Sequence, residues 1–421
     1  MSLKAISLDS IGVRVATVAI GVVILLIGAF TFVWALANNA ALGASQKEVA
    51  QGIVELSPSD PQTHFTSAVQ HEKTFEIGDL NIALAEYEKA AALSPYSYQF
   101  WIELGSARAR AGEEAAAEAA FRRARELAPN YSRVHWALGN LLLRKGSDEE
   151  AYSEIRAAVE GDRTYALPAA TIALQMADGN WEAVRTRFRG LPHAEAALAS
   201  LLAGQKKFDE AADVWSNVKF DSADEKMLDV ARLLKLGFYE GKHFRMAAAV
   251  AAQMPGANGP VVGSITNPGF ELPVKTEGAS EFDWRVSLMS HPQIAVTEGQ
   301  KRSGRYSLIS LFNPADKDFR GFSQVVAVRP GTTYELKFPY RSDIKSKALY
   351  YWEIVSAGDS KRLAVSSPLL ASTDWTDVST TFSVPPETDG IEIRFVRGDC
   401  IASGCATSGS FWFDDISLSA K

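Results

Sequence analysis

The first 40 residues carry an unbroken apolar run rather than an alternating pattern. Val15 to Ala37 is a stretch of 23 mostly apolar residues, and no charged side chain stands between Arg14 and Lys47. At 1.5 Å per residue, a helix of this length spans roughly 34 Å, which exceeds the hydrocarbon core of a bilayer at about 30 Å. The pattern therefore predicts a transmembrane helix at 15–37, preceded by a short tail at 1–14.

Two other interpretations of this run stay open. A cleaved signal peptide has an apolar core of about 7–15 residues, so the run is too long, although the small residues at 35–40 keep cleavage open. A buried core helix would need a polar face to interrupt the run. Lys4 and Arg14 precede the span, which predicts a cytoplasmic N-terminus and extracytoplasmic C-terminal domains, periplasmic or at the cell surface.

A polar connector at 38–61 leads into a region, 62–255, with a helical apolar period that repeats every 34 residues. Gly78, Gly112 and Gly146 keep this step, and four further columns share it: Ala83, Ala117 and Ala151; Tyr87, Phe121 and Ile155; Ala90, Ala124 and Ala158; Pro95 and Pro129. Paired helices with a fixed period of this length predict an all-α solenoid. We expect five or six helix pairs, of which those at 98–131 and 132–165 are the most regular.

Residues 98–131 resemble the tetratricopeptide repeat (TPR) family. The positions that match its pattern are Trp101, Leu104, Gly105, Ala117, Phe121, Ala124, Leu127 and Pro129. In such a solenoid, the repeated columns pack one helix on the next, and a protein partner, if there is one, binds the inner surface that the first helices of the pairs line.

The inner-surface positions, counted outward from Trp101, form a predicted protein-binding groove. They are Gln99, Ile102, Ser106, Arg110, Arg133, Trp136, Asn140 and Arg144. Three arginines beside a tryptophan suit an acidic or carboxylate-ended peptide, through bidentate hydrogen bonds and cation–π contact. The alternative is that the arginines form a solvated face and that Trp136 packs on an adjacent helix.

After a Gly- and Pro-rich linker at 256–264, the apolar period changes from 3.6 to 2. Short alternating runs separated by Gly, Pro, Asn and Ser predict an all-β, antiparallel sandwich at 265–421. Six motifs in order resemble a carbohydrate-binding module of the galactose-binding-like jelly-roll type: 267–271, Trp284, 303–308, 323–334, Trp375 and 411–418. The resemblance implies a jelly roll that engages a glycan, or one that has become a structural module.

Alternation along the strands places one polar set opposite the core-facing residues. This predicted glycan-binding face consists of Lys337, Arg341, Tyr351, Glu353, Glu392 and Arg394. An aromatic ring stacks on the C–H surface of a sugar, and charged groups bind its hydroxyls. The alternatives are a salt-bridged sheet face and a strand in the opposite phase, in which Tyr350 and Trp352 point outward instead.

Two further features concern the stability of the predicted sandwich. The resemblance implies a structural Ca²⁺ that joins the opening and closing strands, held here by Glu271, Asp414 and Asp415, whose carboxylates are the hard ligands that Ca²⁺ prefers. Cys400 and Cys405 are spaced to close a disulfide across a turn, which agrees with an oxidising compartment. Two free thiols are the alternative.

Composition and motifs argue against catalysis and nucleic-acid binding. The net charge is −7, and basic and acidic residues are interspersed without a basic footprint. The six histidines lack metal-ligand spacing, and neither a phosphate-binding loop nor a nucleophile elbow occurs. We therefore expect a non-enzymatic, membrane-anchored envelope scaffold that binds a protein partner and a glycan, in exopolysaccharide assembly or export. The alternatives are a glycan-recognition protein with a solenoid spacer and, least favoured, a glycoside hydrolase using Glu353 and Glu392.

Overall fold

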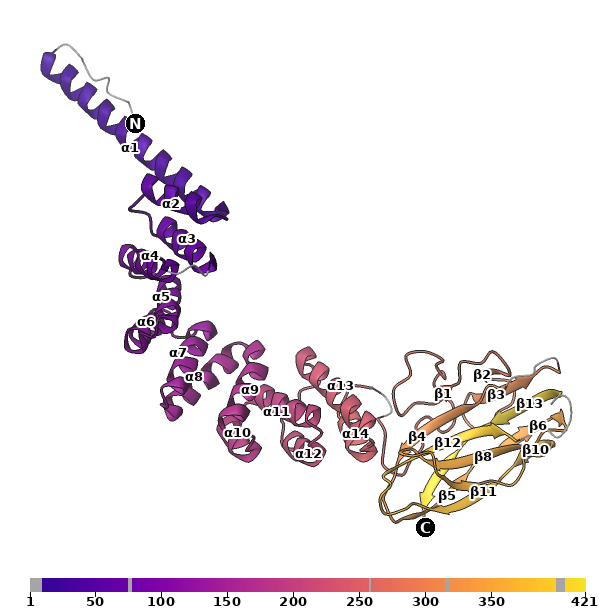
Figure 1. The fold of residues 1–421 in the computed structure, drawn as a ribbon. Coiled ribbons are helices and arrows are strands. Elements are labelled where there is room, and N and C mark those ends of the chain that lie inside the picture. The colour runs from indigo at the N-terminus through magenta and orange to yellow at the C-terminus, as the bar shows by residue number, and fades with distance from the viewer. Residues whose placement is uncertain (1–9, 75–77, 257–258, 315–318, 399–405) are drawn as a thin grey trace, which may run out of the picture. The chain divides into compact units, whose positions relative to one another are not determined.

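The computed structural model describes residues 10–74, 78–256, 259–314, 319–398 and 406–421. The chain divides into two compact units, and the boundary follows Ala169. The first unit contains these helices (Figure 1): α1 (Ile11–Gly43), α2 (Lys47–Leu56), α3 (Pro61–Thr74), α4 (Asp79–Leu93), α5 (Tyr98–Arg110), α6 (Glu114–Leu127), α7 (Ser132–Arg144), α8 (Asp148–Gly161) and the short η1 (Arg163–Tyr165). Helix α9 (Ala166–Met176) contains the boundary.

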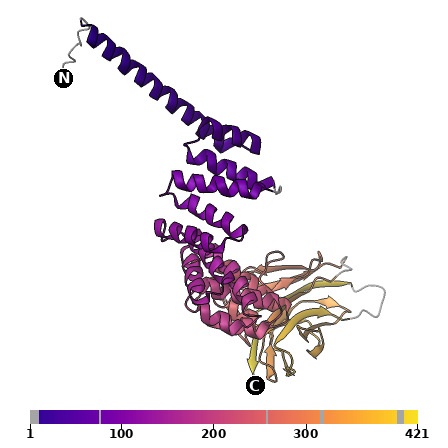
Figure 2. The same cartoon turned by 60° about the vertical axis from the view of Figure 1, so that its left-hand side comes forward.

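Helix α1 is long and apolar enough to cross a membrane, a property that signal sequences share. Its apolar side chains are exposed along most of its 33 residues. Figure 2 shows that most of α1 runs clear of α2 and α3. The last turns differ, because Ala37 and Ala41 are buried against Ile53 of α2. Asn38 also donates a hydrogen bond from Nδ2 to Oδ2 of Asp60, at 2.9 Å. The end of α1 is therefore part of the helical packing that continues into α2 and α3.

The repeat columns pack as the 34-residue period predicts. Tyr87, Phe121 and Ile155 are all buried. Each of the pairs between α3 and α8 turns at a glycine with positive φ, of which Gly112 (φ 81°) lies between α5 and α6. A second glycine column allows close helix contact, since a Cβ added to Gly105 would lie 2.7 Å from the ring of Phe121. These columns therefore have a packing role.

The column that contains Trp101 also links each helix to the turn before it. Trp101 Nε1 donates to the carbonyl oxygen of Pro95 at 3.0 Å. His135, one repeat later, uses Nε2 on the carbonyl of Pro129 at 2.7 Å and Nδ1 on Glu154 at 2.6 Å. These two contacts give His135 a packing role in its repeat.

Asp79, at the first residue of α4, joins three helices. Its carboxylate accepts hydrogen bonds from Thr74 of α3 and from Lys47 Nζ of α2, the latter at 3.2 Å. It also contacts His71 Nδ1 at 3.2 Å. The Thr74 hydrogen bond is the largest cause that lowers the pKa of Asp79 to about 2, from an ordinary value of 3.8.

Because the folded pKa of Asp79 is below the ordinary one, its ionised form stabilises the fold above about pH 4, and this contribution is lost as the pH falls toward 2. We expect the urea midpoint of the first unit to fall across this window in the wild type and to fall less in an Asp79→Asn variant. Equal acid sensitivity of the two proteins, followed by circular dichroism, would contradict the assignment.

The second unit opens with further helices and ends in a β-sandwich. Its complete helices are α10 (Trp181–Phe188), α11 (Pro192–Gly204), α12 (Phe208–Ser216), α13 (Glu225–Glu240) and α14 (Phe244–Ala251). The described residues from α3 to α14 thus contain six helix pairs, which agrees with the five or six expected from the sequence.

The sandwich is built from three antiparallel sheets. Their orders are β1-β4-β12-β8-β9, β10-β6-β13-β3-β2 with β7 beside β13, and β11-β5-β14. The strands are β1 (Arg285–Val286), β2 (Gln293–Thr297), β3 (Ser307–Phe312), β4 (Phe322–Ala327), β5 (Thr333–Lys337), β6 (Tyr340–Ser342), β7 (Lys345–Ser346), β8 (Tyr350–Ser356), β9 (Arg362–Val365), β10 (Ser372–Thr376), β11 (Ser379–Ser383), β12 (Gly390–Arg397), β13 (Thr407–Phe413) and β14 (Ser417–Ala420). Aromatic rings dominate the core between them, including Trp284, Trp352, Phe322, Phe395 and Phe411.

The last helix pair packs directly on the sandwich within this unit. The carboxylate of Asp389 accepts hydrogen bonds from the backbone N–H groups of Phe244 and Arg245, each at 3.2 Å, and so caps the start of α14. Gly390 lies so close to Phe244 that an added Cβ would stand 2.2 Å from its ring. Tyr239 of α13 meets Phe282 edge-to-face, with ring centroids 5.7 Å apart.

Candidate functional site

The predicted groove on α5 and α7 is lined by ion pairs. Arg110 pairs with Glu72 of α3, and Arg133 pairs with Glu103 of α5. Gln99 and Arg144 are exposed, whereas Ser106 donates its hydroxyl hydrogen bond to the carbonyl of Ile102 at 2.9 Å. Two of the three arginines therefore already have carboxylate partners, which weakens the attraction of this surface for an acidic peptide.

Two apolar side chains of the predicted groove pack against other residues and are not exposed to a ligand. Ile102 is only 2% exposed, so its predicted place on the inner surface is wrong: the side chain is buried in the repeat core. Trp136 is half-buried, and its ring centroid lies 5.0 Å from that of Tyr165. Asn140 donates from Nδ2 to the carbonyl of Trp136 at 2.8 Å. The alternative interpretation, in which Trp136 packs on its neighbour, agrees with this geometry.

The predicted glycan-binding set is divided among the three sheets. Tyr351 and Glu353 lie in β8 and Glu392 and Arg394 in β12, which pair in the five-stranded sheet. Arg341 lies in β6 and Lys337 in β5, which belong to the two other sheets. The expectation of one coherent face with all six residues is therefore wrong, because alternation reports the side of a strand but not the sheet that it joins.

Within the five-stranded sheet, the predicted strand phase is right. Tyr350, Trp352 and Ile354 are buried in the core, whereas Tyr351 is half-exposed on the outer side. The ring of Tyr351 lies over Gly398, where an added Cβ would stand 2.9 Å from Cε2. Because Gly398 has no side chain, the ring of Tyr351 can lie against its backbone.

Glu353 is the centre of a three-residue ion-pair cluster on the outer side. Arg394, its direct partner in register, donates from Nε to Oε2 at 2.7 Å, and Arg362 of β9 donates to Oε1. Burial opposes the ionisation of Glu353, but the hydrogen bonds from Arg362 and Arg394 outweigh it and lower its pKa. Sequence reasoning missed Arg362, although the β8–β9 hairpin brings it next to Glu353.

The part of this face that contains Glu392 lies next to the last helix pair. Val325 and Val355, which flank Glu392 in register, are buried. Burial raises the pKa of Tyr239 in α13, with Arg285 opposing and the charge of Glu392 adding to the effect. The part of the face farther from these helices includes Tyr351, Arg394 and Arg362, and Glu353 pairs with both arginines. We call it the Tyr351 surface.

The three predicted calcium ligands gather around one loop, residues 302–306. Asp414 Oδ2 accepts from the backbone N–H of Arg302 at 2.7 Å and of Ser303 at 3.1 Å. Glu271 Oε1 accepts from the N–H of Arg305 at 2.9 Å, and Asp415 Oδ1 accepts from Ser303 Oγ at 2.7 Å. Burial raises the pKa of Asp414, and the charge of Asp415 adds to this.

This donor set has the carboxylate oxygens that suit Ca²⁺, but they already bind backbone and hydroxyl hydrogens. Among the described residues, no three His, Cys, Asp or Glu side chains are arranged to hold a metal ion. The calcium site therefore stays a prediction. The predicted disulfide between Cys400 and Cys405 lies outside the described residues.

No protein-family model and no curated protein matches the chain. Among solved structures, a CBM4 structure is similar at 18% identity over 37% of this chain and 99% of that one, with a TM-score of 0.29. MamA is similar at 18% identity over 44% and 86%, with a TM-score of 0.28. YrrB, a TPR protein with an unusual peptide-binding site, shares 16% identity over 49% and 90%, with a TM-score of 0.27.

These likenesses concern folds alone. The described part of the chain itself has helical repeats followed by an antiparallel β-sandwich, as predicted, and one helix near the N-terminus that is long and apolar enough to cross a membrane.

Proposed function

We propose that this protein is a non-enzymatic scaffold anchored in a membrane by α1, with its repeats and sandwich on the extracytoplasmic side. The repeats bind a protein partner, and the sandwich engages a glycan, in the assembly or export of an exopolysaccharide. The observation that carries this proposal is the packing of Ala37 and Ala41 against α2, because it joins an apolar, membrane-length helix directly to a repeat domain.

The Tyr351 surface is the part of the sandwich that we assign to the glycan. Its half-exposed ring suits stacking on sugar C–H groups, and its two guanidinium groups suit hydroxyl or carboxylate oxygens of an acidic polysaccharide. Glu353 orients both arginines by accepting their hydrogen bonds. Because these contacts are prearranged, little conformational entropy is lost on binding.

Retention of the full chain on gels that contain polysaccharides tests this assignment. We expect a Tyr351→Ala variant to bind at least about tenfold more weakly than the wild type, as for an aromatic anchor at the centre of an interface. Tyr96→Ala is the matched control, because Tyr96 is 80% exposed on the repeats and should leave retention unchanged. Equal retention of the Tyr351→Ala protein would contradict the assignment.

A second candidate is a glycan-recognition protein in which the repeats serve as a spacer. The ion pairs of Arg110 with Glu72 and of Arg133 with Glu103 favour it, because they leave less free charge for a protein ligand. The same gels separate the two candidates: a wild-type chain that no polysaccharide retains rules out the second candidate, whereas the scaffold could still act through a protein partner.

A further inference from the structure

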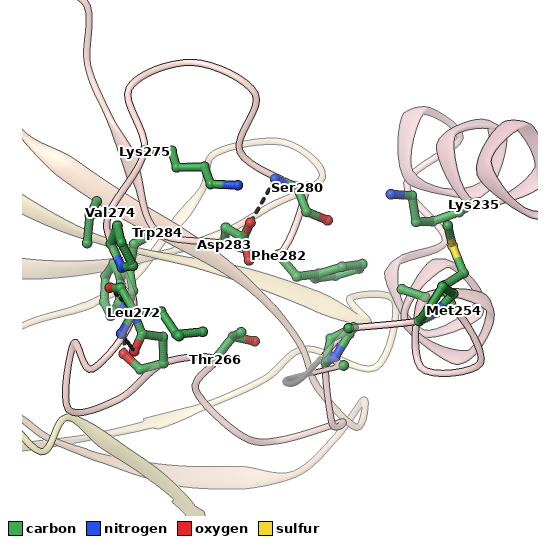
Figure 3. Close-up of a pocket in the computed structure, with 17 residues that line it drawn as sticks. Lys235, Met254, Thr266, Leu272, Val274, Lys275, Ser280, Phe282, Asp283 and Trp284 are labelled. Atoms are coloured by element: carbon green, nitrogen blue, oxygen red, sulfur yellow. Dashed lines mark hydrogen bonds between the residues drawn. The ribbon is translucent and has the colours of Figure 1, made fainter. Parts of the chain in front are cut away.

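A cavity of about 400 Å³ lies between the last helix pair and the segment that leads into β1. Figure 3 shows Lys235 of α13 and Met254 on one side of it, with Leu272, Val274 and Lys275 on the other. The volume is in the range of small-molecule sites, about 300–1,000 Å³. No motif in the sequence predicts this cavity, because its walls come from loops without a regular period.

The interior of this cavity is mainly carbon surface. Phe282 and Trp284, each 2% exposed, are among the residues that line it. The indole N–H of Trp284 donates to the carbonyl oxygen of Asn267 at 3.2 Å, so its hydrogen bond is already used. Asp283 likewise accepts from the backbone N–H of Ser280 at 2.9 Å. An occupant therefore gains more from apolar contact than from hydroxyl groups, which disfavours a sugar.

Two ammonium groups point into this space from opposite walls (Figure 3). Lys235 pairs with Glu281 at 2.5 Å, so its charge is compensated. Lys275 is exposed, and no carboxylate in the described part of the chain lies within ion-pair distance of it. The cavity thus combines an apolar interior with a cation, Lys275, that forms no ion pair within the described residues, while the nearby carboxylate of Asp283 accepts the N–H of Ser280.

We propose that this cavity binds a small apolar or aromatic carboxylate. Its hydrocarbon part lies among Met254, Leu272 and Val274, and its carboxylate lies beside Lys275. The site is separate from the Tyr351 surface and uses none of its residues. Because its walls come from both α13 and the sandwich, a bound ligand also strengthens the contact between them.

Calorimetric titration of the full chain in detergent micelles, with 2-naphthoate as the probe and empty micelles as the blank, tests the proposal. We expect saturable binding at one site. The neutral isostere 2-naphthamide should bind at least about tenfold more weakly, because it keeps the rings but loses the charge that Lys275 attracts. Equal affinities for the two probes would overturn the proposal, as would uptake no different from that of the blank.

Two variants locate the binding. Lys275→Glu should weaken 2-naphthoate at least about tenfold, whereas Lys347→Glu, an exposed lysine outside the cavity lining, should bind as the wild type does. Leu272→Trp should abolish binding by filling the space, and since Leu272 is 44% exposed this variant should fold normally, as a thermal melt would verify. Undiminished binding by either Lys275→Glu or Leu272→Trp would overturn the proposal.

Discussion

Replacing Asp414 by alanine is expected to destabilise the end of the sandwich by about 3 kcal/mol. The side chain is fully buried, and its carboxylate accepts three backbone hydrogen bonds, from Arg302 at 2.7 Å, Ser303 at 3.1 Å and Asp415 at 2.8 Å. These hydrogen bonds are part-buried, and losing one such bond costs about 0.5–1.5 kcal/mol. Three such costs exceed the gain from removing a charge whose burial raises its pKa.

Hydrogen exchange with mass spectrometry measures this effect where it arises. Peptides that cover 302–312 and 407–418 should exchange through openings of lower free energy in Asp414→Ala than in the wild type. Asp377→Ala is the control, because its carboxylate is 71% exposed and the change should stay within about 0.5 kcal/mol. A loss below 1 kcal/mol in Asp414→Ala would show that the loop at 302–306 does not depend on this carboxylate.

The same peptides test the proposed calcium ion. If Glu271, Asp414 and Asp415 bind Ca²⁺, a chelator should speed exchange in the wild type and have little further effect in Asp414→Ala, which already lacks a ligand. If the chelator does not change exchange in the wild type, the three carboxylates do not bind Ca²⁺, and they act only by accepting hydrogen bonds.

A side chain introduced at Gly139 is expected to cost the repeats about 3 kcal/mol. An added Cβ would lie 2.8 Å from Cγ1 of Ile155 and 3.2 Å from the carbonyl oxygen of Ala151. The second contact is with the backbone, so α7 and α8 must move apart, and a Gly139→Val change adds two further methyl groups to the same space. Overpacking of this kind typically costs 1–3 kcal/mol or more.

Gly237→Ala provides the matched control for this prediction. Gly237 is also a helical glycine, but no other part of the structure lies within 4 Å of its added Cβ. Alanine there should stabilise α13 by up to about 1 kcal/mol. Thermal melts followed at 222 nm compare the two variants. A Gly139→Val protein that melts with the wild type would mean that the repeat tolerates a wider helix separation.

The repeats could be predicted well because each column is sampled several times. Ala83, Ala117 and Ala151 occupy one environment in three successive pairs, so the period itself identifies them as packing residues. The burial of a single side chain between these columns is harder to predict. Ile102 occupies a position counted as inner surface, yet an apolar side chain there is buried by neighbouring side chains, and no column count contains that information.

In the sandwich, the direction of single side chains could be predicted, but the sheet that each strand joins could not. Alternation correctly places Trp352 inside and Tyr351 outside, because side-chain direction is a local property of a strand. Sheet membership is not local: β8 pairs with β12, far along the chain, whereas β5 and β6 join other sheets. The predicted face is therefore wrong for Lys337 and Arg341, and no strand pattern shows that the last helix pair lies next to Glu392.

The packing of α1 on α2 and α3 has a mechanical consequence. In the proposed membrane-anchored protein, a flexible tether would let the repeats rotate freely while the anchor stays still in the bilayer. Here Ala37 and Ala41 belong to the same apolar contact as Ile53, and Asn38 is bonded to Asp60. Rotation or tilt of α1 therefore turns α2 and α3 with it. Likewise, a force that acts on α2 or α3 is transmitted through these contacts to α1, so torque passes between the repeats and the membrane-length helix.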